Sequence, residues 1–338
     1  MEDLYDITII GGGPAGLFGA YYAGFRGLRS KIVDSQPDLG GQITALYPDK
    51  FIYDVAGFPK ILGKDLVINL VDQAMQYKPA IHLNEEIRSL KHGPDRTITM
   101  GSTGGEHRTR VVLITGGIGA FTSKTYKRPE FDRYVDHGLY YAVRRKEDFR
   151  GKDVLVVGGG DSALDWALNL LPYARHITQI HRRDGFRAHA DSVKKLMDSP
   201  ITVKVFYELR ALRGDPDITE AVIFNNKTGQ EEVLKVDAVL AFLGLVSNLG
   251  PISTWGLTLE EDSIVVNTRM ETNVPGVYAA GDIVTFPGKL KLIATGFGEA
   301  ATAVNNAARY INPDASIFPG HSSTIMEKAE KEVARQAR

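Results

Sequence analysis

The chain has 338 residues, 35 of them glycine and none of them cysteine, and its 40 basic and 41 acidic side chains give a formal net charge of −1. At about 150 residues per domain, this length favours two domains. The missing thiols exclude disulfides, cysteine-held zinc or iron–sulfur centres and a thiol nucleophile, and the balanced charge argues against wholesale binding of nucleic acid. No apolar run approaches the ~20 residues of a membrane span, and the acidic start lacks the features of a secretory signal, so we expect a cytoplasmic protein.

The first residues predict a β-α-β unit. An apolar strand at 5–10 leads into Gly11-Gly12-Gly13-Pro14-Ala15-Gly16, a helical stretch follows to about Gly27, and a second strand ends in Asp34. In a Gly-x-Gly-x-x-Gly pattern the first glycine permits the tight turn, the second lets a pyrophosphate approach the backbone, and the third lets helix and strand pack closely. Asp34 stands where a carboxylate can accept hydrogen bonds from an adenosine ribose. Glycines alone are compatible with a plain structural turn, but the strand, helix and acid in register favour a dinucleotide site.

The same pattern returns 147 residues later (158 − 11). A strand at 153–157 precedes Gly158-Gly159-Gly160-Asp161-Ser162-Ala163, and the next strand ends in His181-Arg182-Arg183. Arg182 now occupies the place of Asp34, and a guanidinium can bind a 2′-phosphate that a carboxylate would repel. The second unit therefore favours NADP over NAD, with a solvated basic turn as the alternative. The predicted NADP contacts are Gly158, Gly160, Asp161, Ser162, Ala163, Arg182, Arg183 and Arg187.

Later segments indicate how the two units are connected. Glycines punctuate the chain at 116–119 and again at 244–250, after a β-rich stretch at 201–243. A strand then ends in Ala280-Gly281-Asp282, and a Gly/Ala-rich helix is predicted at about 296–310. We expect an α/β protein with two Rossmann-like, three-layer domains. The first is discontinuous, residues 1–120 and 247–338, and residues 121–246 form a second domain inserted in it.

Longer motifs carry a resemblance to a known family. They are Gly40–Pro48, Tyr53–Pro59, Gly159–Asn169, His181–Arg183 and Pro319–Ser323. From about residue 5 to 325 the chain resembles the thioredoxin reductase group of two-dinucleotide flavoproteins and, more narrowly, the thioredoxin-reductase-like ferredoxin–NADP(+) reductases. The resemblance implies that the discontinuous domain binds FAD and the inserted domain binds NADPH. It also implies a homodimer in which the C-terminal tail reaches the flavin of the other subunit.

The resemblance also implies individual contacts. Tyr47 would stack on one face of the flavin ring and His321 would lie near the other, while His321 or Ser322 would relay a proton. A core or turn aromatic is the other interpretation of Tyr47. The eight histidines show no tight ligand spacing, so no metal site is expected. The implied FAD contacts are Gly11, Gly13, Ala15, Gly16, Asp34, Gln42, Tyr47, Ile87, Phe121, Asp282 and Ser323.

The missing cysteines decide among activities of this group. Thioredoxin reductases carry a Cys-x-x-Cys pair before the second glycine motif, where this chain has Gly138-Leu139-Tyr140-Tyr141-Ala142-Val143. Disulfide exchange is impossible without that pair, so electrons would leave the flavin directly. We expect a ferredoxin–NADP(+) reductase whose partner is a ferredoxin or flavodoxin. The alternatives are an NADPH oxidase or diaphorase acting on small acceptors and a non-catalytic NADP-sensing protein. A basic stretch from Lys124 to Lys146 is a candidate docking face for an acidic ferredoxin, or only a solvated surface.

Overall fold

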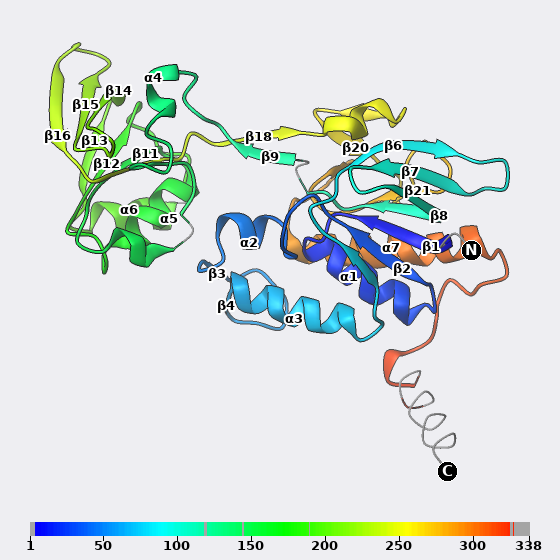
Figure 1. Ribbon diagram of the computed structural model, residues 1–338. Coiled ribbons are helices and arrows are strands. Elements are labelled where there is room, and N and C mark those ends of the chain that lie inside the picture. The colour runs from blue at the N-terminus through cyan, green and yellow to red at the C-terminus, as the bar shows by residue number, and fades with distance from the viewer. Residues whose placement is uncertain (1–3, 118–119, 144, 189, 325–326, 328–338) are drawn as a thin grey trace. The chain divides into compact units, whose positions relative to one another are not determined.

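The computed structural model describes residues 4–117, 120–143, 145–188, 190–324 and 327, with the backbone alone at 120–123 and 245–248. The chain divides into two compact units (Figure 1). Unit 1 comprises residues 1–120 and 248–338, and unit 2 comprises residues 121–247. Among the described residues, no helix combines the length and the apolar character that crossing a membrane requires.

Unit 1 is built on a seven-stranded sheet of order β5-β2-β1-β8-β7-β6, in which β21 also pairs with β8. Strands β5, β2, β1, β8 and β21 run parallel, while β6 and β7 are antiparallel. All four residues of β2 are buried, as expected for a parallel strand covered on both faces. The strands are β1 (Leu4–Ile10), β2 (Ser30–Val33), β5 (Ala80–His82), β6 (Ile87–His92), β7 (Ile98–Ser102), β8 (Glu106–Ile114) and β21 (Val277–Ala279).

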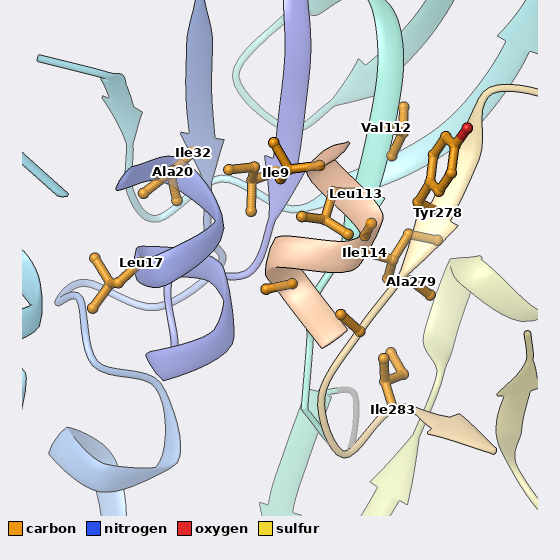
Figure 2. Packing of buried hydrophobic residues seen from close by; sticks show 14 of the residues in the cluster. Ile9, Leu17, Ala20, Ile32, Val112, Leu113, Ile114, Tyr278, Ala279 and Ile283 are labelled. Atoms are coloured by element: carbon orange, nitrogen blue, oxygen red, sulfur yellow. The ribbon is translucent and has the colours of Figure 1, made fainter. Parts of the chain in front are cut away.

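Helices α1 (Pro14–Phe25), α3 (Gly63–Met75) and α7 (Ile293–Ile311) accompany this sheet. Small residues let α1 and α7 lie close, since a Cβ on Gly19 would be 3.8 Å from the Cβ of Ala300. Ile9, Leu17 and Leu113 belong to the core that the helices and strands share (Figure 2). Shorter elements complete the unit: α2 (Gln42–Leu46), β3 (Phe51–Ile52), β4 (Ile61–Leu62), η2 (Gly250–Thr254), β19 (Leu259–Glu260), β20 (Ser263–Val265) and β22 (Val284–Thr285).

Unit 2 repeats the arrangement around a five-stranded parallel sheet of order β10-β17-β11-β12-β13. Leu155 and Val157 of β11 enter one buried cluster, and Val154 and Val156 enter another, because side chains alternate across a strand. Helix α5 contributes to the second cluster and the antiparallel strands β14 and β15 to the first, which makes three layers. The predicted α/β architecture with two Rossmann-like folds is therefore confirmed.

The elements of unit 2 follow in chain order. Strands β9 and β18, in which the chain passes from one unit to the other, pair with each other. The bounds are β9 (Ala120–Ser123), α4 (Pro129–Asp132), β10 (Leu139–Tyr140), η1 (Lys146–Phe149), β11 (Asp153–Val157), α5 (Asp161–Leu170), β12 (His176–His181), α6 (Ala190–Met197), β13 (Thr202–Val205), β14 (Tyr207–Arg213), β15 (Glu220–Asn225), β16 (Glu231–Lys235), β17 (Ala238–Ala241) and β18 (Leu245–Asn248).

Candidate functional site

The turn between β1 and α1 leaves room for backbone only. A Cβ on Gly11, whose φ is +107°, would lie 2.8 Å from the carbonyl oxygen of Thr115. A Cβ on Gly16 would lie 1.9 Å from the carbonyl oxygen of Gly11, so helix and turn could not approach with any other residue. Gly13 is the N-cap of α1 and has no side chain to bond the first N–H groups of the helix. These donors and the positive end of the helix dipole suit an anionic group.

Two further loops meet this turn and form a glycine cradle, defined as residues 11–13, 40–42 and 115–117. The N–H of Gly40 donates to the carbonyl oxygen of Gly12 at 2.8 Å. A Cβ on Gly41 would lie 3.0 Å from the Cα of Gly13, and one on Gly117 would lie 2.9 Å from Nε2 of Gln42. Backbone from three separate segments thus meets at one edge of the sheet. The cradle lies at the carboxyl ends of β1 and β8, where the order of the strands along the chain reverses across the sheet. In open α/β sheets, ligands bind at such a switch point.

Asp34 directly follows β2 and its carboxylate is held by backbone. Oδ2 accepts the N–H of Gly12 at 2.5 Å, and Oδ1 accepts the N–H of Gln36 at 2.8 Å. Burial raises the pKa of Asp34, and the two backbone hydrogen bonds oppose that rise. Each oxygen keeps a lone pair for a further donor such as a ribose hydroxyl. Ile87, another predicted contact, is buried at the start of β6.

Tyr47 ends helix α2 and shares its surroundings with two acids. Burial raises the pKa of Tyr47 to about 12, and the charges of Asp282 and Asp54 act in the same direction. The phenol is therefore neutral at physiological pH. Asp54 belongs to the segment 53–59, which with Ala294 lines a shallow hollow of about 610 Å³. Tyr47 and Asp282, two predicted FAD contacts from segments far apart in sequence, thus lie close enough for the charge of Asp282 to act on the phenol.

A buried ion pair stabilises the turn that carries Asp282. Lys289 Nζ lies 2.5 Å and 2.7 Å from the two carboxylate oxygens of Glu299, and Glu299 Oε2 also accepts the N–H of Gly281 at 2.9 Å. The two side chains are 4% and 9% exposed. Sequence reasoning missed both residues. The available signal was Glu299 itself, a single acid among the small residues that line the buried stripe of α7.

Unit 2 forms a second turn of the same type, between β11 and α5. A Cβ on Gly158 would lie 2.6 Å from the carbonyl oxygen of Phe242, and one on Gly159 would lie 2.4 Å from the ring of His181. Gly160 is the N-cap of α5, so Asp161, Ser162 and Ala163 form its first turn. The N-terminal N–H groups of α5 are again placed for an anion.

Three exposed arginines lie next to this second turn. Arg182 and Arg183 follow β12, and the backbone N–H of Arg187 donates to the carbonyl oxygen of Gly159 at 2.8 Å. His181 stacks on Phe186 with ring centroids 5.2 Å apart. Burial lowers the pKa of His181, and the charges of Arg182, Arg183 and Arg187 lower it further. This electropositive corner suits a phosphate group.

The remaining predicted residues are not gathered at the cradle within one chain. His321 makes an edge contact with Phe318 at 5.2 Å, and Ser322 and Ser323 are exposed. In Figure 1 the tail that carries them projects from the body of unit 1. The side chain of Phe121 lies outside the described part of the chain, and its backbone belongs to unit 2.

A protein-family model described as pyridine nucleotide-disulphide oxidoreductase matches residues 5–307. The chain belongs to this family. It is therefore an oxidoreductase, and the resemblance that the motifs indicated is confirmed. Within the family the chain is 52% identical over 326 residues to ferredoxin–NADP reductase 2 of Shouchella clausii, covering 96% of this chain and 99% of that protein. It is 51% identical to the ferredoxin–NADP reductase of Thermus thermophilus over 95% of this chain and 97% of the relative.

Solved structures of thioredoxin reductases agree with the fold. The thioredoxin reductase of T. acidophilum superimposes with a TM-score of 0.79 at 27% identity, covering 93% of this chain and 100% of that one. Lactococcus lactis thioredoxin reductase, in its FR conformation, gives a TM-score of 0.78 at 25% identity over 91% of this chain and 99% of the other. Relatives at about 50% identity are thus named ferredoxin–NADP reductase. These structural neighbours, at 25% and 27% identity, are named thioredoxin reductase.

Proposed function

We propose that this protein is a ferredoxin–NADP(+) reductase that holds FAD in unit 1 and NADP(H) in unit 2. One observation carries the proposal: a glycine cradle with a carboxylate in unit 1 and a second turn flanked by arginines in unit 2 occur in a chain without cysteine. The names of relatives at about 50% identity support the same activity.

The residues of unit 1 fit FAD. The bare N-terminus of α1 offers N–H groups to the pyrophosphate, and Asp34 has acceptor capacity for the adenosine ribose. A neutral Tyr47 can pack against a flat ring, which adds about 0.5–1.5 kcal/mol to burial of its area. Asp282, whose charge acts on Tyr47, would bind the ribityl hydroxyls. When bound, FAD exchanges a hydride with a nicotinamide and electrons one at a time with a protein carrier.

The residues of unit 2 fit NADP(H). The N–H groups in the first turn of α5 would bind the pyrophosphate, and Arg182, Arg183 and Arg187 would supply guanidinium groups for the 2′-phosphate. Without a dithiol, no protein group can store the two electrons between the nucleotides and the acceptor. The acceptor therefore draws electrons from unit 1 directly. A homodimer in which the C-terminal tail reaches the flavin of the other subunit, a proton relay by His321 or Ser322, and a cytoplasmic location are parts of the same proposal.

A visible spectrum and a coupled assay test this function. We expect a yellow protein that reduces a ferredoxin with NADPH much faster than it consumes oxygen. Oxygen or quinone turnover that matches the rate with ferredoxin would favour an NADPH oxidase or diaphorase instead. A colourless protein that binds NADPH would favour the non-catalytic NADP sensor.

A further inference from the structure

Strands β5 and β6 lie at opposite ends of the sheet order in unit 1, yet only residues 83–86 join them. In a flat sheet the five strand spacings between them would span ~24 Å. The five residue steps from His82 to Ile87 reach at most ~18 Å. The part of the sheet that contains β6 and β7 therefore curves back toward β5. Residues 83–86 cross this curved region.

A partly buried polar network, here the Glu85 network, ties this crossing segment to the sheet. It consists of Lys31, His82, Glu85, Ser102 and His107. Lys31 Nζ lies 3.1 Å from Nδ1 of His107, and Nε2 of His107 lies 2.7 Å from Glu85 Oε1. The Ser102 hydroxyl donates to Glu85, and His82 Nδ1 lies 3.3 Å from Glu85 Oε2. Lys31 and His107 are only 4% and 5% exposed. The contacts within the Glu85 network join strands β2, β5, β7 and β8.

The partners of His107 assign its proton. An ammonium group can only donate, so Nδ1 accepts from Lys31 and Nε2 carries the hydrogen that it donates to Glu85. Burial lowers the pKa of His107, which agrees with a neutral ring. Burial alone would raise the pKa of Glu85, but hydrogen bonds from Ser102 and His107 hold it below its ordinary value. A neutral imidazole thus links a buried cation to an anion that is only 11% exposed.

The same geometry argues against a metal ion at this place. Ligand atoms of His82, Glu85 and His107 all lie within 4.8 Å of one another, a spacing that could hold one. A metal on Nε2 of His107 would require the ring proton on Nδ1, directly facing the ammonium of Lys31 at 3.1 Å. Lys31 therefore supplies the positive charge that the cluster needs.

The network is bonded to the predicted adenosine side of the FAD site. The backbone N–H of Glu85 donates to the carbonyl oxygen of Asp34 at 2.9 Å, and the N–H of Asp34 donates to the carbonyl oxygen of His82 at 2.9 Å. Ile87 follows two residues later. We infer that Lys31, Glu85 and His107 are positioning residues that fix Asp34 and Ile87 for the adenosine half of FAD. This inference rests on the proposed function of unit 1.

Binding of two flavins to the full chain, with its own flavin removed, tests the inference. FAD carries the adenosine half and FMN lacks it. We expect Glu85→Gln and Lys31→Met each to raise the dissociation constant for FAD about tenfold, as loss of one charge-assisted contact would, and to leave that for FMN unchanged. Glu86→Gln is the matched control: Glu86 is the next residue, carries the same charge, and its side chain is 41% exposed and pairs with Arg88 at 3.2 Å. It should change neither constant.

The dependence of FAD binding on pH provides a second measurement. A merely structural role of the network would not change it. The charged or titratable groups that face His107 are Lys31, Glu85 and His82. Because burial lowers the pKa of His107 below its ordinary value of 6.5, the ring gains its second proton only under acid conditions. That proton would direct a hydrogen at Lys31, so we expect FAD binding to the wild type to weaken only as pH falls below 6.5. His107→Asn should abolish this response, and His82→Asn should keep it.

Several outcomes would overturn the inference. Equal weakening of FAD and FMN by Glu85→Gln would show a general structural effect. Unchanged FAD binding in Glu85→Gln would remove the positioning role, while the proposed function would stand. Stoichiometric binding of Zn²⁺ that His107→Asn abolishes would make the cluster a metal site. A wild-type chain that binds neither flavin would overturn the proposed function together with the inference.

Discussion

Arg182 and Arg183 are exposed side chains beside a helix N-terminus, a position in which charge has a direct effect on ligand choice. We expect replacement of both by Ala to raise KM for NADPH by about ten- to 100-fold, since charge-assisted contacts to a 2′-phosphate are lost. KM for NADH, which lacks that phosphate, should change little. Steady-state kinetics with both nucleotides measure this, with Arg213→Ala, on β14, as the control. Equal effects on the two nucleotides would contradict the NADP assignment.

Two histidines, His107 and His181, determine at the residue scale how the free energy of unfolding changes with pH. Burial lowers the pKa of His107 and of His181 below the ordinary 6.5. The unfolded chain then binds more protons than the folded chain below pH ~6.5, so the free energy of unfolding decreases as pH falls through that range. Denaturant unfolding at pH 7.5 and pH 5.5 checks this. We expect His107→Asn to reduce the difference between the two pH values, and an unchanged difference would contradict the assignment to His107.

At the scale of elements, the link between α7 and the turn at Gly281 depends on a buried ion pair. Glu299→Ala leaves the Lys289 ammonium buried without its partner, and we expect it to lower the free energy of unfolding by about 3–5 kcal/mol. Replacing both residues, Lys289→Met with Glu299→Leu, should recover part of that loss because no charge stays buried. Denaturant unfolding compares the three proteins. A double variant as unstable as the single one would show that the pair is not the cause.

Helix boundaries show why some elements were predictable. The glycine pattern and apolar periodicity place α1 from Pro14, but it ends at Phe25 rather than Gly27, which adopts a φ of +72°. Helix α7 begins at Ile293, three residues before its predicted start, and Thr295 bonds the backbone of Leu292 there. Local signals thus identify the element. Its exact end depends on caps that a glycine-rich sequence shows poorly.

At the scale of the whole molecule, the basic residues of unit 2 predict where an acidic protein partner binds. Lys124 and Lys127 are exposed, whereas the guanidinium groups of Arg128 and Arg133 donate to the backbone carbonyls of Arg210 and Gly214. We therefore expect Lys124→Glu with Lys127→Glu to raise KM for an acidic ferredoxin several-fold at low salt, with less effect at high salt. Oxidation of NADPH by a small dye should not change. Lys91→Glu, on β6 of unit 1, is the control, and an equal effect there would contradict a docking role for unit 2.

The sequence alone determined the class of the protein. Both glycine turns, Asp34 after one strand and Arg182 after another are local patterns, because a turn that admits only glycine and an acid that ends a strand are encoded within a few residues. The lack of cysteine excluded a dithiol from composition alone. Which residues contact FAD or NADP stays a prediction.

Only the tertiary structure brought together the groups that hold these turns in place. Lys31 and His107 are 76 residues apart, and they meet because β2 and β8 flank β1 and a long lysine spans the distance. Lys289 and Glu299 belong to none of the sequence motifs, yet their side chains are buried and Glu299 accepts the N–H of Gly281. A buried charge requires a partner, and the choice of partner depends on sheet order and curvature, which no local pattern contains.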